Sequence, residues 1–226
     1  MLTFTRHQAD RFDHIAFTPE TLVIAGWAGR DEKAIHHHIE ELAAIGVPPP
    51  SSVPVFYRGA NALLTQATRV EVLGPDSSGE IEPVIVSLAD GLWVTVGSDH
   101  TDRKAETVGI ALSKQMCAKP VATALWKLDE VTAHWDELIL RSHAVIDGAR
   151  VLYQEGKLSA LRPPSDLIAK WTGHATLPPA TVMFGGTLGA IGGIRPAARF
   201  EMELIDPVLN RAISHAYDIA DLPVVS

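Results

Sequence analysis

The sequence has little cysteine, few aromatic residues and no excess of positive charge. Cys117 is the single cysteine among 226 residues, so the chain cannot form an internal disulfide, which is typical of a reducing compartment. There are 19 Lys and Arg against 27 Asp and Glu, and the net charge of −8 argues against sequence-independent nucleic-acid binding. No apolar run approaches roughly 20 residues, the length of a membrane-spanning helix. The N-terminal segment carries charges where a signal peptide is apolar. We therefore expect a cytoplasmic protein without a membrane span.

The composition that remains is that of a folded globular protein. Hydrophobic residues make up 46% of the chain and charged residues 20%. The length suffices for one domain with a substantial core. We expect residues 1–25 to form a short N-terminal element and residues 26–226 to form the main domain.

Turn and capping residues divide the chain into short elements. Asp31 is a suitable N-cap for a helix over residues 34–45, which Gly46 ends and Pro48 cannot continue. The remaining pattern predicts strands at 15–17, 21–25, 55–57, 70–73, 81–88, 92–96, 137–146, 151–153, 181–184 and 199–205, and helices near 101–117, 123–135 and 164–174. Because strands and helices do not alternate regularly, we expect an α+β fold that is mainly β, with a largely antiparallel sheet and a few covering helices.

A predicted hairpin brings three carboxylates together. Asp90-Gly91 between two strand-like runs is a strong signal for a two-residue loop. With that loop, Ala89 lies opposite Leu92, and the register then pairs Ile85 with Val96, Pro83 with Ser98 and Glu82 with Asp99. Glu80 is two residues before Glu82, so both side chains point to the same face. Glu80, Glu82 and Asp99 therefore converge.

Such a cluster needs compensation, because like charges placed opposite each other are destabilising. A hard divalent cation is a natural partner, since Mg²⁺ takes oxygen ligands in an octahedron. Three monodentate carboxylates leave three positions open, which suits bidentate binding of an oxo acid or enolate. The competing interpretation is a solvated acidic edge of the hairpin.

Several segments, in this order along the chain, together resemble the fumarylacetoacetate hydrolase superfamily, in particular its compact bacterial members. The resemblance covers about residues 26–215. It rests on the motifs Gly29-Arg30-Asp31, His38-Ile39-Glu40-Glu41-Leu42, Phe56-Tyr57-Arg58-Gly59-Ala60-Asn61-Ala62-Leu63, Glu80-Ile81-Glu82, Ser98-Asp99-His100-Thr101-Asp102-Arg103, Ser113-Lys114, Val145-Ile146-Asp147-Gly148 and Thr176-Leu177-Pro178-Pro179-Ala180-Thr181-Val182-Met183-Phe184-Gly185-Gly186-Thr187.

Four departures mark a divergent branch of that superfamily. Arg58 stands where the resembled proteins usually have Lys, Ser98 where they have Asn, and Leu188 where they have Pro. The gap between Glu82 and Asp99 is also shorter than usual. The substrate can therefore differ from those of known members.

The resemblance implies a mixed β-roll or β-sandwich with peripheral helices and a homodimer. It also implies that Glu80, Glu82 and Asp99 hold Mg²⁺ or Mn²⁺. The implied activity is hydrolysis of a C–C bond in a small oxo-carboxylic acid, such as an acylpyruvate or related β-dicarbonyl, through a stabilised enolate. The same site can serve decarboxylation, dehydration or isomerisation of a 2-oxo acid. A third alternative is a metabolite-binding protein without catalytic activity.

Two further residues are candidates for proton transfer. His38 and Glu41 are separated by three positions, so they share one face of the predicted helix, and a carboxylate can orient an imidazole that acts as general base. They match a His-x-x-Glu pair of the resembled proteins. His37 with Glu40 is the competing pair.

The other candidates are expected around the substrate. Lys114 matches a lysine that would neutralise developing negative charge, with Lys119 as its rival. Arg30, Tyr57, Arg58 and Thr187 are expected in the substrate pocket, and Arg103 is expected to support the ligands or bind a substrate carboxylate. Cys117 is expected to be a buried, unreactive thiol.

Overall fold

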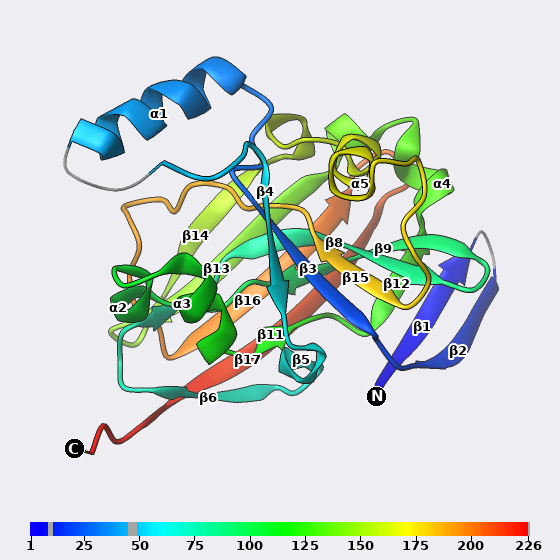
Figure 1. Cartoon of the computed structure of the whole chain (residues 1–226). Helices are drawn as coiled ribbons and strands as arrows, with labels where there is room; N and C mark the ends of the chain where they lie inside the picture. The colour runs from blue at the N-terminus through cyan, green and yellow to red at the C-terminus, as the bar shows by residue number, and fades with distance from the viewer. Residues whose placement is uncertain (9–10, 45–48, 226) are drawn as a thin grey trace.

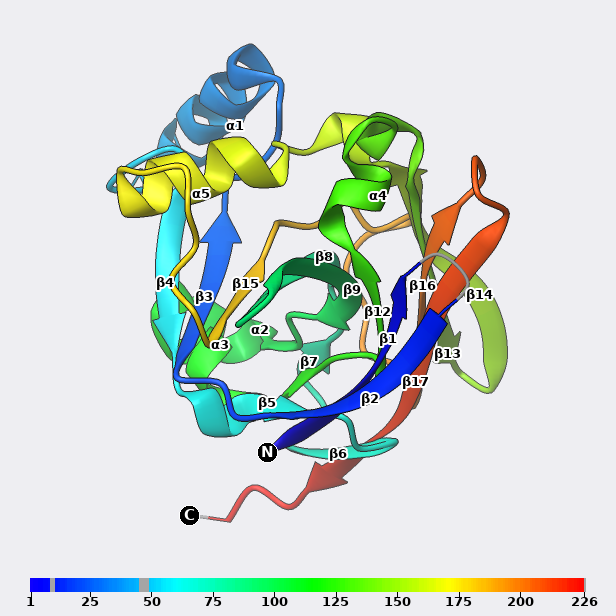
Figure 2. The same cartoon turned by 90° about the vertical axis from the view of Figure 1, so that its right-hand side faces the viewer.

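The protein is built from two β-sheets with short helices at their margins (Figures 1 and 2). The computed structural model describes residues 1–8, 11–44 and 49–225, without the side chains of residues 34, 38 and 41–44. Within these residues, no helix is long and apolar enough to cross a membrane.

The larger sheet has eight strands. In spatial order they are β2 (Arg11–Phe17), β1 (Leu2–Gln8), β12 (Ala124–Lys127), β9 (Gly91–Ser98), β8 (Ile81–Leu88), β15 (Thr181–Phe184), β3 (Thr21–Gly26) and β4 (Val55–Gly59). Residues 1–25, expected as a short N-terminal element, thus supply β1, β2 and most of β3 to this sheet. The sheet is mixed, because β1 pairs with β12 and β3 with β15 in parallel.

The second sheet has five strands, in the order β14 (Ala149–Lys157), β13 (Ile139–Ile146), β16 (Arg199–Asp206), β17 (Arg211–Leu222) and β6 (Arg69–Leu73). Two small pairs join β10 (Thr101–Asp102) to β7 (Ser77–Ser78) and β11 (Lys119–Pro120) to β5 (Leu64–Thr65). The prediction of an α+β fold that is mainly β, with largely antiparallel pairing, is confirmed.

Helices cover the margins of the sheets. They are α1 (Glu32–Ala44), α2 (Arg103–Glu106), α3 (Ile110–Met116), α4 (Leu128–Thr132) and α5 (Pro164–Thr172), with 3₁₀ turns at Asn61–Leu63, Trp135–Glu137 and Leu158–Ala160. Both views show α1, α4 and α5 at the same end of the molecule (Figures 1 and 2). Asp31 caps α1 as predicted, since its Oδ1 accepts the Lys33 N–H at 3.0 Å. Ile45, Gly46 and Pro48, predicted to end this helix, lie outside the described residues.

Strand β8 lies between two hydrophobic clusters, which explains why it is buried along its whole length. Ile81 and Ile85 face the cluster shared with the five-stranded sheet, whereas Val84 and Val86 face the cluster shared with β3 and β15. Glu82 is on the Val84 face. A charged residue at this position is therefore buried and needs polar or ionic partners.

Two predicted helices are wrong in part. The segment 101–117 forms β10, α2 and α3, because Asp102 caps α2 and Gly109, with extended backbone, separates it from α3. The segment 123–135 begins as β12, in which Leu125 and Trp126 point into opposite clusters and pair the strand with its neighbours. Tertiary pairing overrides a helix-like pattern there.

The predicted hairpin register is also wrong, by two residues. Leu88 pairs with Gly91, so Ala89 and Asp90 form the loop, and Glu82 lies opposite Gly97 rather than Asp99. Asp90 is held there by Arg6 Nη1 at 2.6 Å and Trp93 Nε1 at 3.0 Å. Because a shift of two residues leaves every side chain on its original face, the three carboxylates still converge.

Strands β1 and β17 were not anticipated. Each is buried on part of one face, with Leu2 and Phe4 buried in β1 and Ile213 and Tyr217 buried in β17. The exposed residues between the buried ones give both segments a polar composition, so the sequence pattern did not indicate a strand.

Asp206 provides a test of the turn between β16 and β17. Its fully buried carboxylate accepts the N–H groups of Val208 at 3.1 Å and Leu209 at 3.0 Å, and pairs with Arg211 Nε at 3.2 Å. Burial raises the pKa of Asp206, but these hydrogen bonds and that of His134 outweigh burial, so the pKa lies below its usual value.

We expect Asp206→Asn to lower the free energy of unfolding by about 1–3 kcal/mol at pH 7. Because the folded pKa is depressed, this contribution is present above the unfolded pKa of about 3.9 and is lost as the pH falls through the folded pKa. Urea denaturation at pH 7, 5 and 3.5 measures it. The control Asp218→Asn removes an exposed carboxylate paired with Arg199 and should cost less than about 1 kcal/mol. A difference between wild type and Asp206→Asn that grows at low pH would contradict the assignment.

Candidate metal centre and adjoining cavity

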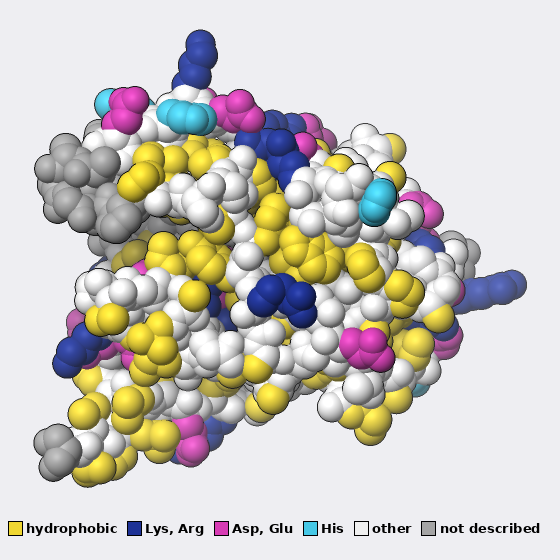
Figure 3. Space-filling model, viewed as in Figure 1, with side chains coloured by type: hydrophobic (Ala, Val, Ile, Leu, Met, Phe, Trp, Pro, Cys, Tyr) yellow, Lys and Arg dark blue, Asp and Glu magenta, His cyan; other side chains and the backbone are white. Residues whose placement is uncertain are grey.

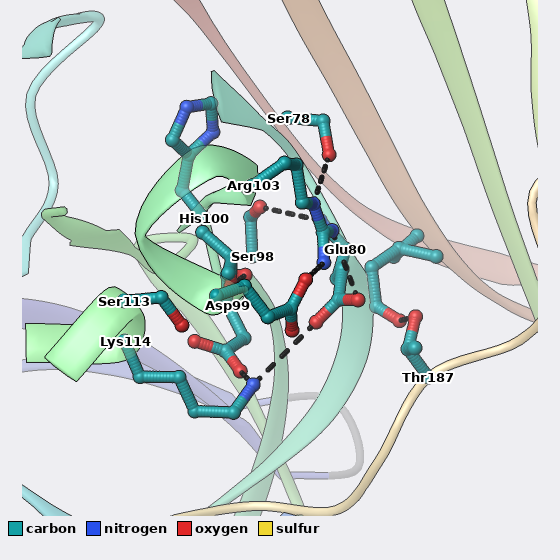
Figure 4. Close-up of polar contacts among 12 residues, drawn as sticks. Ser78, Glu80, Ser98, Asp99, His100, Arg103, Ser113, Lys114 and Thr187 are labelled. Carbon is teal, nitrogen blue, oxygen red and sulfur yellow. Dashed lines mark hydrogen bonds and ion pairs between the residues drawn. The ribbon is translucent and has the colours of Figure 1, made fainter. Parts of the chain in front are cut away.

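Glu80, Glu82 and Asp99, the acidic cluster, meet where β8 begins and β9 ends. Figure 4 shows Glu80 and Asp99 with Lys114 and Arg103 beside them. One oxygen from each carboxylate lies within 4.8 Å of the others. Glu82 and Asp99 are 2% and 0% exposed, and the Glu80 side chain is 16% exposed. The cluster is thus part of the interior, which excludes a solvated hairpin edge.

The antiparallel ladder positions these residues. The Asp99 N–H donates to the Glu80 carbonyl oxygen at 2.9 Å, which extends the pairing of β8 and β9 by one step. Glu80 and Asp99 are therefore cross-strand neighbours, and Glu82 follows two residues along the same face.

Three cationic side chains compensate the acidic cluster. Lys114 on α3 pairs with Asp99 Oδ2 and lies 3.7 Å from Glu80 Oε2. Lys119 on β11 is completely buried, and its Nζ lies 2.9 Å from Asp99 Oδ1 and 2.5 Å from the His100 carbonyl oxygen. Arg103 Nη2 lies 2.9 Å from Glu80 Oε1. The two rival lysines of the sequence therefore both contact one metal-ligand candidate.

The same surroundings shift the pKa values of two of the carboxyl groups in opposite directions. Burial raises the pKa of Asp99, but the charges of Lys114 and Lys119 outweigh burial and lower it overall. Burial raises the pKa of Glu82 well above its usual value, and the charge of Asp99 raises it further. Glu82 is therefore the member of the cluster that most needs an additional cation.

Arg103 holds Glu80 in place through an ion pair and is itself fixed by two further partners. Its Nε donates to Ser78 Oγ at 2.7 Å and its Nη1 to Glu106 Oε2 at 2.9 Å, in addition to the pair with Glu80. The planar guanidinium thus has protein partners on each of its three nitrogens, which suits support of Glu80.

The Gly185-Gly186-Thr187 segment after β15 closes the other side. The Gly186 N–H donates to Glu82 Oε2 at 2.8 Å. Gly186 has φ +93°, and a Cβ there would lie 2.6 Å from Ala28 Cβ, so only glycine fits without displacement. Thr187 Oγ1 donates to the Ile81 carbonyl oxygen at 2.8 Å and accepts from Gln154 Nε2 at 2.8 Å. Its hydroxyl proton therefore fixes the loop to β8.

A buried network behind Asp99 was not foreseen from the sequence. The Tyr217 hydroxyl donates to Ser98 Oγ at 2.8 Å, and Ser98 Oγ also accepts the Glu80 N–H at 3.2 Å. His100 bridges Tyr217 and Ser77, each at 2.9 Å. Burial lowers the pKa of His100 to about 3, so the ring is neutral. The network connects the cluster to β17 of the second sheet.

The acidic cluster opens into a cavity of about 1190 Å³. Of the predicted residues, Tyr57, Arg103, Lys114 and Thr187 line it, together with Glu80 and Glu82. Tyr57 lies next to Lys114, whose Nζ is 5.8 Å from the ring centroid. Lys119 is not among the lining residues, which distinguishes it from Lys114.

Two predicted pocket residues lie elsewhere. The Arg30 guanidinium makes two contacts of 2.7 Å with Asp136 and donates to the Leu161 carbonyl oxygen at 3.1 Å. Arg58 is exposed on β4, because it alternates with Tyr57, which faces the cavity. Neither is brought to the acidic cluster.

His38 and Glu41 belong to α1, but their side chains lie outside the described residues. Ile35, one turn before His38, lines the cavity. Cys117 is buried, and burial raises the pKa of its thiol to about 11, as expected for an unreactive cysteine.

The sequence matches a family model described as Protein of unknown function (DUF2848), over residues 25–217. The chain belongs to this family. A search of curated proteins by sequence finds no significant match.

The fold is similar to that of a fumarylacetoacetate hydrolase family protein and of other solved structures, as the resemblance implied. The chain is similar to Cg1458 solved with an inhibitor (TM-score 0.66, 16% identity, 93% of this chain and 81% of that one). It is similar to yeast ynq8, a fumarylacetoacetate hydrolase family protein (0.62, 14%, 92% and 95%). It is also similar to 2-keto-3-deoxy-D-arabinonate dehydratase complexed with magnesium and 2,5-dioxopentanoate (0.64, 14%, 92% and 75%). At these identities the likeness concerns the fold.

We expect the protein, stripped with a chelator, to bind one Mn²⁺ per chain, and Glu82→Gln to weaken this binding by at least about tenfold because it removes a buried ligand. Electron paramagnetic resonance of free Mn²⁺ measures both. Glu137→Gln is the matched control, since it removes a carboxylate from a surface pair with Lys157, outside the cluster and the cavity wall. Equal loss in both variants would indicate a general effect of charge and contradict a site at Glu82.

Proposed function

We propose that the protein is a divalent-metal-dependent enzyme that hydrolyses a C–C bond in a small oxo-carboxylic acid, such as an acylpyruvate or related β-dicarbonyl. The observation that carries this proposal is the buried acidic cluster at the wall of a large cavity. Its three carboxylates supply the hard oxygen ligands that Mg²⁺ and Mn²⁺ prefer. The similar dehydratase was solved with magnesium and a dioxo acid, which supports this ligand chemistry for the fold.

The residues fit such a cation. Glu82 is buried beside Asp99 and accepts a hydrogen bond from the Gly186 N–H, so a cation would satisfy a charge that burial otherwise opposes. Glu80, Glu82 and Asp99 would hold the ion. When bound, it would act as a Lewis acid toward the oxo and carboxylate oxygens of the substrate.

Lys114 is the residue best placed to meet developing negative charge. Lys114 lines the cavity, whereas Lys119 pairs with Asp99 and is not among the residues that line the cavity. Burial opposes the charge on Lys114, but the three carboxylates outweigh burial and raise its pKa, so it remains an ammonium. Its N–H donors would stabilise the oxygen of the departing enolate.

His38, oriented by Glu41, is proposed as the general base. It would take a proton from water, and the water oxygen would add to the acyl carbonyl carbon. The bond between that carbon and the adjacent methylene then breaks, its electron pair forms the enolate, and the enolate carbon takes a proton. The products are two carboxylic acids. Support comes from the i, i+3 spacing and from Ile35, which brings α1 to the cavity.

A second candidate is dehydration, decarboxylation or isomerisation of a 2-oxo acid at the same site. The likeness to a dehydratase favours it. These reactions use the same enolate chemistry without a water nucleophile. Decarboxylation would therefore persist without His38, whereas C–C hydrolysis requires it. Dehydration and isomerisation also need a base to move a proton, so His38→Ala separates the alternatives only in part.

We expect the Mg²⁺-loaded protein to convert a 2,4-dioxo acid into two acids, followed as loss of the ultraviolet absorbance of the β-diketone. His38→Ala should reduce kcat by about 10²- to 10⁴-fold, the usual contribution of a general base, without weakening substrate binding. His37→Ala should stay within a few-fold of wild type, because adjacent helical residues point in different directions. Loss of kcat in His37→Ala but not in His38→Ala would contradict the assignment. A loaded protein that binds the dioxo acid without turnover would indicate a metabolite-binding role instead.

A further inference from the structure

The cavity beside the acidic cluster is larger and less polar than a short oxo acid needs. Its volume of about 1190 Å³ exceeds the roughly 300–1,000 Å³ typical of sites for drug-sized ligands. We infer that the substrate carries an extended apolar acyl group, alkyl or aryl, rather than a second carboxylate or a chain of hydroxyls. This inference rests on the proposed function and specifies the part of the substrate that lies beyond the oxo acid.

The apolar wall comes from three separate parts of the chain. Trp27 precedes α1 and Ile35 lies on it. Val108 lies between α2 and α3, and Ile110 begins α3. Leu188 and Ile194 lie in the segment after β15. Figure 3 shows hydrophobic side chains on both sides of the hollow between α1 and the α2–α3 segment. Such a wall favours an apolar ligand, since burial of apolar surface is its main source of affinity.

Two of these side chains are unusually exposed for their size. Val108 is 80% exposed and Ile194 is 56% exposed, although both line the cavity. Exposed aliphatic side chains that gather at a concave site are typical of a site that binds an apolar ligand. An acyl group that passes between them would remove their surface from water.

The charges at the wall disfavour a second carboxylate. Among the described residues, Arg103 and Lys114 are the cationic side chains that line the cavity, and both already pair with the acidic cluster. Glu106 adds a further negative charge to the wall. Arg195, next to Ile194, instead donates to the Ile191 carbonyl oxygen at 2.7 Å. A terminal carboxylate would lose its water without gaining a cation.

Two uncharged polar side chains of the wall, Thr107 and Gln154, are also engaged within the protein. Thr107 Oγ1 donates to the Lys104 carbonyl oxygen at 2.7 Å, and Gln154 Nε2 donates to Thr187 Oγ1 and to the Leu188 carbonyl oxygen. Substrate hydroxyls would have to displace these bonds. An alkyl or aryl group needs no such exchange.

The test uses 2,4-dioxo acids that share one head group and end in methyl, pentyl, phenyl or a carboxylate. Their dissociation constants are measured by calorimetry on the Mn²⁺-loaded His38→Ala protein, which is expected to bind the dioxo acids with greatly reduced turnover. We expect affinity to rise by up to about fourfold for each methylene that is buried between the methyl and pentyl compounds. The phenyl compound should also bind more tightly than the methyl compound, and the carboxylate compound more weakly.

A pair of surface variants locates the acyl group. Val108→Lys combined with Ile194→Lys places two cations at the mouth and should reduce the preference for pentyl over carboxylate by about fivefold or more. The matched control is Val208→Lys combined with Leu209→Lys, which changes two exposed aliphatic residues in the β16–β17 turn, outside the cavity. The control should keep the wild-type preference.

The outcomes separate this inference from the proposed function. Equal affinity for all four compounds, or tightest binding of the carboxylate compound, would overturn the apolar acyl group and leave the oxo-acid site intact. An unchanged preference in the Val108→Lys and Ile194→Lys protein would likewise overturn it. Failure of every dioxo acid to bind the loaded protein would overturn the proposed function itself.

Discussion

The burial of Glu82 and Asp99 beside Glu80 is the constraint on which the rest of the site depends. Carboxylates removed from water must be paired, and Coulomb repulsion between them grows as the local dielectric constant falls. Lys114 and Lys119 neutralise Asp99, and Arg103 neutralises Glu80. Glu82 receives one backbone N–H and no direct ion pair among the described contacts. The negative charges of Asp99 and Glu80 are therefore neutralised by protein cations, whereas Glu82 faces the cavity, from which a cation and its substrate would enter.

The mixed fold explains how distant segments supply these groups. The β8–β9 hairpin carries the carboxylates, and the short segments that follow β9 return Arg103, Lys114 and Lys119 to its end. The turn after β15 brings Gly186 onto Glu82, and β17 of the second sheet supports Ser98 through Tyr217. Both sheets thus contribute to one site, which couples the geometry of the ligands to the hydrophobic core between them.

Much of this arrangement could be predicted from sequence because it depends on alternation. Glu80, Glu82 and Asp99 share a face in either hairpin register, so the error of two residues changed the partners and not the cluster. Contacts made by long side chains could not be predicted in the same way. Arg30 turns to Asp136, and Lys119 joins Lys114 on Asp99, because partners distant in sequence decide where a flexible cation lies. Gln154 carries no local signal in the sequence, and its contacts with Thr187 and Leu188 depend on residues more than 30 positions away.

The acidic cluster as a divalent-cation site is the central claim, and its geometry can be observed directly. The decisive measurement is a crystal structure of the protein grown with Mn²⁺, with anomalous difference density collected near the manganese absorption edge. The account predicts one strong peak within about 2.0–2.3 Å of an oxygen from each of Glu80, Glu82 and Asp99, with further positions facing the cavity. Full occupancy of manganese elsewhere, with the Lys114 ammonium still in contact with Glu80 and Asp99, would contradict it.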